Sequence, residues 1–260
     1  MVAALLVFHH IPKTGGTTIR KLLQPNLGEI SFLHLNEQKE LERIARNQKA
    51  VTEFTTTDWA RIRIVFGHAV HQNTGIDCGR QRLVCSVLRD PVAWLISKYN
   101  QEMRKYHRDG VQPLAFEKWY RIAPLSRSLV DWLVRYYLSA PNLLGRPQSE
   151  KRKIALNAVQ KLDFVVDLRD LDTCMPSLLT FLCMPIATPT RANAAGLDYL
   201  NHFSESGGCW QAVVDRLESD LRFYEDASPL LVDNAKKFRH PTSLLAVQAR
   251  HRVSHSSDLN

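Results

Sequence analysis

The chain has 260 residues, of which 45% are hydrophobic and 23% charged, and these proportions are those of an ordinary globular protein. This length suffices for one domain with a sizeable core, and no apolar run is long enough to cross a bilayer, which excludes a membrane-spanning protein. The formal net charge of +8 favours anionic ligands, although a basic solvated surface would carry the same charge.

The N-terminal residues predict a strand, a turn and a helix that together form an anion-binding cradle. An apolar run at residues 3–8 leads into Pro12–Thr18, a turn that carries a lysine, glycines and threonines, and residues 19–23 predict the first turns of a helix. Small residues let backbone N–H groups approach phosphate oxygens, and a helix N-terminus adds about half a positive charge. A glycine turn without a ligand is the alternative interpretation.

The order of residues in this turn differs from that of an ATPase loop. In the Walker A pattern, G-x-x-x-x-G-K-[ST], the lysine follows the glycines. Here Lys13 precedes Gly15 and Gly16. The turn is therefore a poor match to an ordinary ATP-binding loop.

A candidate general base follows the next predicted strand. Residues 61–66 are largely apolar and end in Gly67-His68. Histidine, with an unperturbed pKa near 6.5, can accept a proton at neutral pH. His68 is the first candidate and His71 the second; a hydrogen-bonded loop histidine is the alternative.

A second anion site is predicted after residues 83–88, an apolar run typical of a buried parallel strand. Arg89 stands at the tip of that strand, and Asp90 and Pro91 suit the N-cap and the first position of a helix. Ser97 lies about two turns into that helix, so its hydroxyl and the Arg89 guanidinium can converge on one phosphate. A surface arginine before a capped helix would look the same.

Together these motifs resemble those of the PAPS-dependent sulfotransferases, especially the carbohydrate O-sulfotransferases. The string His10–Thr18 resembles their loop for the 5′-phosphosulfate, and Arg89 and Ser97 match their 3′-phosphate motif at its spacing. Gly67-His68 resembles the segment that supplies the catalytic histidine in the 2-O-type enzymes. Ala93 and Trp94 depart from the glutamate and arginine often seen in the following helix, which are not phosphate ligands. The resemblance covers residues 3–230.

The resemblance implies an α/β fold with a P-loop-like central parallel sheet, helices on both faces and the ligand at the carboxyl ends of the strands. It also implies in-line transfer of a sulfuryl group from PAPS (3′-phosphoadenosine 5′-phosphosulfate) to an acceptor hydroxyl, with release of PAP. Lys13 would neutralise charge on the leaving phosphate, and His68 would take the acceptor proton. The implied cofactor-binding residues are Lys13, Thr14, Gly15, Gly16, Thr17, Thr18, Arg89, Ser97 and, from a looser match, Arg191.

The rest of the chain predicts helices at 38–48, 113–122, 150–162 and 171–182, with one more strand at 163–168. Residues 128–138 carry an aromatic stripe that is either core, cleft wall or a surface on which the acceptor stacks. Residues 220–224 resemble the closing helix of the sulfotransferase domain. We expect that domain over residues 1–233 and a basic, mobile C-terminal tail over residues 234–260.

The acceptor expected from the resemblance is a carbohydrate hydroxyl, of a glycan or a glycolipid. A protein tyrosine or a small alcohol is an alternative acceptor. Other classes remain open: a phosphotransferase with an atypical nucleotide loop, or a catalytically silent protein that binds nucleotides or polyanions. We expect no metal, because sulfuryl transfer needs none, and no nucleic-acid partner.

The location expected from the sequence is the cytoplasm of a bacterium. The residues before the first loop are not typical of a secretory leader or a membrane anchor, from which we expect a cytosolic enzyme, with a shortened form of a longer protein as the alternative. The five cysteines include no C-x-x-C pair, which favours reduced thiols.

Overall fold

Five parallel strands form the centre of the computed structural model, which describes residues 4–36, 50–122, 128–184, 186 and 208–246. The order across the sheet is β2-β3-β1-β4-β5, so the chain crosses over between neighbours. Such crossovers are typical of parallel sheets covered by helices. The predicted α/β fold with a parallel sheet is confirmed. The strands are β1 (Leu5–His9), β2 (Phe32–Leu35), β3 (Ile64–Gly67), β4 (Arg82–Leu88) and β5 (Phe164–Asp167).

The register brings the carboxyl ends of the central strands level with one another. His9 of β1 is paired with Gly67 of β3 and Ser86 of β4, and Leu88 of β4 is paired with Asp167 of β5. The segments that leave β1, β3, β4 and β5 therefore start at one edge of the sheet. This is why three motifs that lie far apart in the sequence can contribute to one site.

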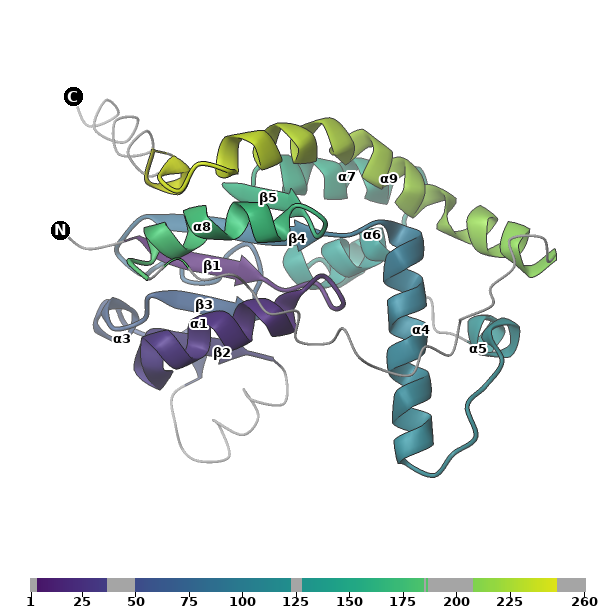
Figure 1. Cartoon of the computed structure of the whole chain (residues 1–260). Coiled ribbons are helices and arrows are strands. Elements are labelled where there is room, and N and C mark those ends of the chain that lie inside the picture. The colour runs from purple at the N-terminus through teal and green to yellow at the C-terminus, as the bar shows by residue number, and fades with distance from the viewer. Residues whose placement is uncertain (1–3, 37–49, 123–127, 185, 187–207, 247–260) are drawn as a thin grey trace.

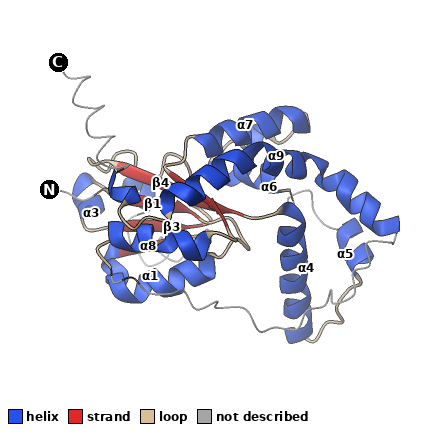
Figure 2. Cartoon of the chain, turned by 45° about the horizontal axis from the view of Figure 1, so that its top comes forward, coloured by secondary structure: helices blue, strands red, loops and turns tan. Residues whose placement is uncertain are grey.

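Alternate side chains of the strands pack on opposite faces of the sheet, as the two-residue period of a strand requires. Leu6 and Phe8 lie in the core beneath α1 (Gly16–Ser31) and α8 (Leu171–Phe181). The opposite face is covered by α3 (Thr56–Ala60), α6 (Leu129–Trp132), α7 (Gln148–Gln160) and part of α9 (Gly208–Phe238). Figure 2 shows these helices around the strands.

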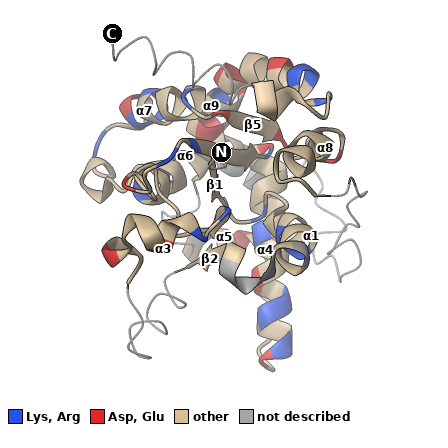
Figure 3. Cartoon of the chain, turned by 90° about the vertical axis from the view of Figure 1, so that its left-hand side faces the viewer, with Lys and Arg blue, Asp and Glu red and all other residues tan. Residues whose placement is uncertain are grey.

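A smaller cluster of apolar side chains lies beyond the sheet. The helix α4 (Pro91–Arg108) leaves the edge at which β4 ends and packs with α5 (Phe116–Ile122) through Tyr99 and Trp119. The long helix α9 joins this cluster to the sheet, and it lies alongside α7 and above β5 (Figure 1). Lysines and arginines are conspicuous along α4 (Figure 3). The short elements are η1 (Val51–Glu53), the π-helical turn η3 (Leu133–Tyr137) and η4 (Pro141–Leu143).

Several sequence expectations are corrected or refined by the structure. The boundary at residue 233 falls inside α9, which runs to Phe238. Phe238 and Leu244 are fully buried in the main core, so residues 234–246 are part of the fold and not a mobile tail. The aromatic stripe at 128–138 lies on α6 and η3. The short strand β2 carried too little periodicity to be predicted.

Two other expectations fall on residues outside the described part of the chain, namely the helix at 38–48 and the end of the chain from residue 247. Within the described parts of the chain, no helix combines the length and the apolar character needed to cross a membrane.

Candidate functional site

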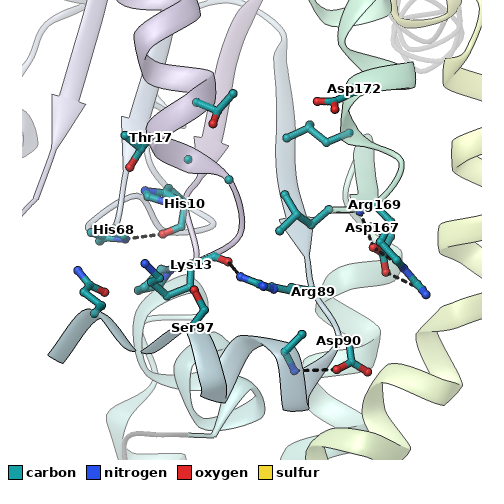
Figure 4. Close-up of a pocket in the computed structure, with 18 residues that line it drawn as sticks. His10, Lys13, Thr17, His68, Arg89, Asp90, Ser97, Asp167, Arg169 and Asp172 are labelled. Carbon is teal, nitrogen blue, oxygen red and sulfur yellow. Dashed lines mark hydrogen bonds and ion pairs between the residues drawn. The ribbon is translucent and has the colours of Figure 1, made fainter. Parts of the chain in front are cut away.

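A cavity of about 720 Å³ opens at the carboxyl edge of the sheet. Its wall comes from the segments after β1, β3, β4 and β5, together with the first turns of α1, α4 and α8 (Figure 4). The side chains that matter for its chemistry are His10, Lys13, Thr17, Thr18, His68, Arg89, Asp90, Ser97, Asp167 and Arg169. Open α/β sheets commonly bind ligands at this edge.

The loop after β1 has an unusual backbone that neighbouring side chains hold in place. Lys13 has a φ of 67°, a left-handed conformation that costs a non-glycine residue about 1–3 kcal/mol. Three side chains donate hydrogen bonds to successive carbonyl oxygens of the loop. Thr14 Oγ1 donates to Ile11 O (2.8 Å), Trp94 Nε1 to Pro12 O (2.6 Å) and Arg89 Nη1 to Lys13 O (3.0 Å). These bonds engage the carbonyl oxygens that would otherwise repel an anion.

The helix α1 starts directly after this loop and presents its N-terminus to the cavity. Gly15 O accepts the first helical bond, from Ile19 N at 3.1 Å, so the amides of Gly16 and Thr17 precede the first intrahelical donor. No acidic residue lies in the first turn to compete for them. Both glycines are required by the geometry: Gly15 has a φ of 84°, and a Cβ on Gly16 would lie 1.9 Å from His10 Nε2. The loop therefore has the geometry with which an anion could approach the backbone closely.

Two cations without carboxylate partners stand beside this cradle. Burial lowers the pKa of Lys13, and Arg104 and Arg89 lower it further. Burial also lowers the pKa of Arg89, although Asp90 and Asp167 act in the opposite direction. Among the described residues, neither Lys13 nor Arg89 has a carboxylate oxygen within 4.0 Å. An anion in the cavity would relieve the repulsion between them.

Asp90 and Asp167, which also line the cavity, form no ion pair with Lys13 or Arg89, because their oxygens bond to other groups. Asp90 caps α4 by accepting from the amide of Ala93 at 2.8 Å. Asp167, which is buried, accepts from Arg169 N (2.7 Å) and Arg169 Nε (3.1 Å) and from the hydroxyl of Tyr224. Arg89 consequently keeps its remaining N–H donors for a ligand, and the Ser97 hydroxyl lies in the same lining.

His68 is held in the tautomer that a general base needs. Its Nδ1 lies 2.6 Å from His10 O, and because a carbonyl oxygen only accepts, Nδ1 carries the hydrogen. Burial lowers the pKa of the imidazole, which the bond to His10 partly opposes and Arg20 lowers further. The ring is therefore neutral at neutral pH, with a free electron pair on Nε2. The ring of His10 stacks on it at a centroid distance of 4.3 Å.

Most of the residues predicted from the sequence line this one cavity, namely Lys13, Gly15, Gly16, Thr17, Thr18, His68, Arg89 and Ser97. Thr14 is the exception within the loop, because its side chain is buried and holds Ile11 O instead of facing the cavity. His71, the second candidate base, is not in the lining, and its Nδ1 accepts from the amide of Asn73 at 3.3 Å. Arg191 lies outside the described residues.

Sequence reasoning missed several residues that shape the site. In the sequence, Trp94 only departs from the sulfotransferase pattern, yet its indole holds the loop at Pro12 O. His10 is part of the loop motif in the sequence, and in the structure it also fills the space that Gly16 leaves free and stacks on His68. The pairing of Arg169 with Asp167 had a weak signal in the sequence, because both follow the apolar run of β5.

Within the described residues, no group of three or more His, Cys, Asp or Glu side chains is placed to hold a metal ion. Comparison with known proteins adds no family assignment: no protein-family model matches the chain, and no curated protein sequence matches it.

Proposed function

We propose that this protein is a PAPS-dependent sulfotransferase that transfers a sulfuryl group to a hydroxyl of a carbohydrate. The observation that carries the proposal is that one cavity joins an anion cradle with its lysine, an arginine–serine pair, and a histidine whose Nε2 is free to accept a proton. The donor set fits PAPS, which carries two separated anionic groups. The resemblance of the motifs to those of sulfotransferases is the reason why we propose sulfuryl transfer as the reaction.

In the proposed site the amides of Gly15, Gly16 and Thr17 bind the 5′-phosphate, and Arg89 and Ser97 bind the 3′-phosphate. Arg89 also fixes the loop through Lys13 O, so the two phosphate sites are mechanically connected. PAPS supplies the sulfuryl group when bound. Catalysis by the protein then consists mainly of positioning and of electrostatic stabilisation.

The proposed reaction needs one proton acceptor and one cation. His68 Nε2 takes the proton of the acceptor hydroxyl while that oxygen forms its bond to sulfur. Lys13 stabilises the negative charge that develops on the phosphate oxygen as its bond to sulfur breaks. The products are a sulfate ester and PAP, with one proton on His68.

The reducing location expected from the sequence is part of the same proposal. The described cysteines, Cys78, Cys85, Cys174 and Cys183, are all free thiols. This agrees with a cytoplasmic enzyme, since disulfides are rare in that compartment.

The first experiment is a thermal-shift titration with PAP, adenosine 5′-phosphosulfate and Mg-ATP in parallel. A ligand at one hundred times its dissociation constant adds about 2.7 kcal/mol, or about 5–10 °C for a chain of this size. We expect the large shift with PAP, because only PAP carries a 3′-phosphate for Arg89. A shift with Mg-ATP and none with PAP would contradict the proposal and favour an atypical phosphotransferase.

Variants then separate binding from chemistry. His68→Ala should keep the PAP shift and lose turnover of PAPS, whereas His71→Ala should keep both. Lys13→Ala should lose turnover in a folded protein, and Lys13→Gly serves as the second variant because glycine tolerates the φ of 67°. Full turnover in His68→Ala would remove the assigned base, and an active Lys13→Gly enzyme would remove the assigned cation.

A further inference from the structure

A second cavity, of about 370 Å³, lies between α6, η3 and the start of α7. Its volume is within the range of about 300–1,000 Å³ that is typical of small-molecule sites. The lining residues are Asp131, Trp132, Arg135, Tyr136, Leu144, Gln148 and Lys151.

One wall of this cavity is a pair of aromatic rings. The rings of Trp132 and Tyr136 lie at a centroid distance of 4.1 Å and an angle of 32°. The guanidinium of Arg135 lies 5.4 Å from the centroid of the Tyr136 ring. The π-helical turn η3 contributes Arg135 and Tyr136, and π-helical turns occur frequently at functional sites.

The lining also contains a buried ion pair with unused hydrogen-bonding capacity. Lys151 Nζ donates to Asp131 Oδ1 at 2.7 Å and to Leu144 O at 3.1 Å, and its side chain is only 4% exposed. Two of the three ammonium hydrogens are thus used. Among the described residues, Asp131 Oδ2 has no hydrogen-bond partner and Arg135 no carboxylate partner. The cavity therefore offers both donors and an acceptor beside an apolar surface.

Trp132 connects this cavity to the site described above. Its ring lines the second cavity and also meets the ring of His68 edge-on, at a centroid distance of 5.8 Å and an angle of 79°. A molecule that packs on Trp132 in the second cavity is therefore one side chain away from His68.

We propose that the second cavity binds a pyranose unit of the acceptor, next to the unit whose hydroxyl is sulfated. This inference rests on the proposed function. A pyranose has an apolar C–H face, which packs on aromatic rings, and a rim of hydroxyls that need donors and acceptors. Trp132 and Tyr136 supply the rings, while Arg135, Gln148 and the Asp131–Lys151 pair supply the polar contacts. A small alcohol would leave this cavity empty.

The test measures sugar binding and PAP binding separately on the full chain. The probes are an array of neutral and acidic oligosaccharides and an array of tyrosine-containing peptides, both incubated with protein and excess PAP. The strongest-binding oligosaccharide is then titrated by calorimetry against Arg135→Ala and Tyr136→Ala. Trp132 is left unchanged because it contacts His68. Tyr136→Phe, which keeps the ring, and Arg146→Ala, which removes an exposed arginine outside the cavity, are the matched controls.

We expect Tyr136→Ala and Arg135→Ala to weaken oligosaccharide binding about tenfold or more, with PAP affinity unchanged and both controls like the wild type. Three outcomes would overturn the inference: no oligosaccharide bound, peptides bound in place of oligosaccharides, or oligosaccharide affinity unaffected by both substitutions. If oligosaccharide binding depends on Tyr136 but PAP does not bind, the donor assignment fails and the sugar site stands.

Discussion

Three histidines cluster near the end of β1, and their surroundings give them different properties. His9 turns to the face away from the cavity, where its Nδ1 bonds to Val70 O at 2.6 Å and burial lowers its pKa to about 4. His10 lines the cavity, and burial beside other histidines holds its pKa well below the usual range. His68 is the one whose hydrogen-bonded Nδ1 leaves Nε2 unprotonated in the lining. This environment is the reason why we propose His68, and not His9 or His10, as the base.

The pH profile of the reaction tests these assignments. Because the pKa of His68 is lowered from 6.5, its neutral form persists below pH 6.5, and the acidic limb of kcat/KM should have its midpoint below that value. Because the pKa of Lys13 is lowered from 10.5, the alkaline limb should have its midpoint below 10.5. The measurement is the initial rate with PAPS over a series of buffers. An acidic midpoint above 6.5 would contradict the lowered pKa of His68, and His71→Ala should leave that limb in place.

A substitution at Gly16 tests how closely the loop after β1 packs against the His10 ring. A methyl group at this position would lie 1.9 Å from His10 Nε2, so Gly16→Ala should displace either the His10 ring or the loop. We expect PAP affinity to fall at least about tenfold, as measured by calorimetry. The control is Gly145→Ala, since a Cβ at Gly145 meets no atom within 4 Å. Equal PAP affinity in the two variants would show that the cradle tolerates a side chain.

Among the elements, α9 supports the wall of the second cavity through one carboxylate. Asp220 of α9 accepts hydrogen bonds from Ser128 Oγ (2.7 Å), Leu129 N (2.7 Å) and Val130 N (3.0 Å), which lie at the start of α6. The first turn of a helix has no internal acceptors for its amides. Asp220 therefore links two segments that lie far apart in the sequence. It also accepts from buried donors that would otherwise have no hydrogen-bond partner.

Removal of this carboxylate should be costly. We expect Asp220→Ala to lower the free energy of unfolding by about 2–4 kcal/mol, because buried amides lose their acceptor. Urea unfolding followed by circular dichroism measures the loss. Asp215→Ala, on the exposed side of the same helix, should change the free energy of unfolding by no more than about 0.5 kcal/mol. If the two variants have the same free energy of unfolding, the hydrogen bonds from Asp220 to α6 do not stabilise the fold.

For the whole molecule, the end of α9 closes the core that includes α1 and α8. Phe238 is fully buried and packs on Phe164 of β5 at a centroid distance of 4.7 Å. Asn234 Nδ2 donates to Val165 O at 3.0 Å, and Leu244 N donates to Ser177 Oγ of α8 at 3.1 Å. Residues beyond 233 thus join the sheet to its covering helices.

Because Phe238 is packed in the core, its substitution should cost much stability, although the sequence predicts a mobile tail from residue 234. Phe238→Ala should lower the free energy of unfolding by about 3–5 kcal/mol, as expected for a large-to-small change in a core. The comparison is Lys236→Ala, an exposed neighbour on the same turn, which should leave the urea midpoint almost unchanged. A Phe238→Ala protein as stable as Lys236→Ala would mean that the end of α9 adds nothing to the fold.

The sequence alone was enough to predict the parallel α/β fold, four of the five strands and the start of α4 after Asp90. These features depend on neighbouring residues: apolar runs, a capping carboxylate followed by proline, and glycines beside a lysine. It also located eight of the residues that line the cavity, because motifs at strand ends converge wherever the strands are parallel and in register. The missed features depend on contacts between distant segments.

Only the tertiary structure decided which histidines face the cavity, that Thr14 faces away from it, and that Trp94 and Arg89 hold the loop. The burial of Phe238 and the second cavity between residues 131 and 151 were decided in the same way. The physical reason is that a residue's local pattern fixes its element and its face, whereas its hydrogen-bond partner and its burial depend on which elements the chain packs against it.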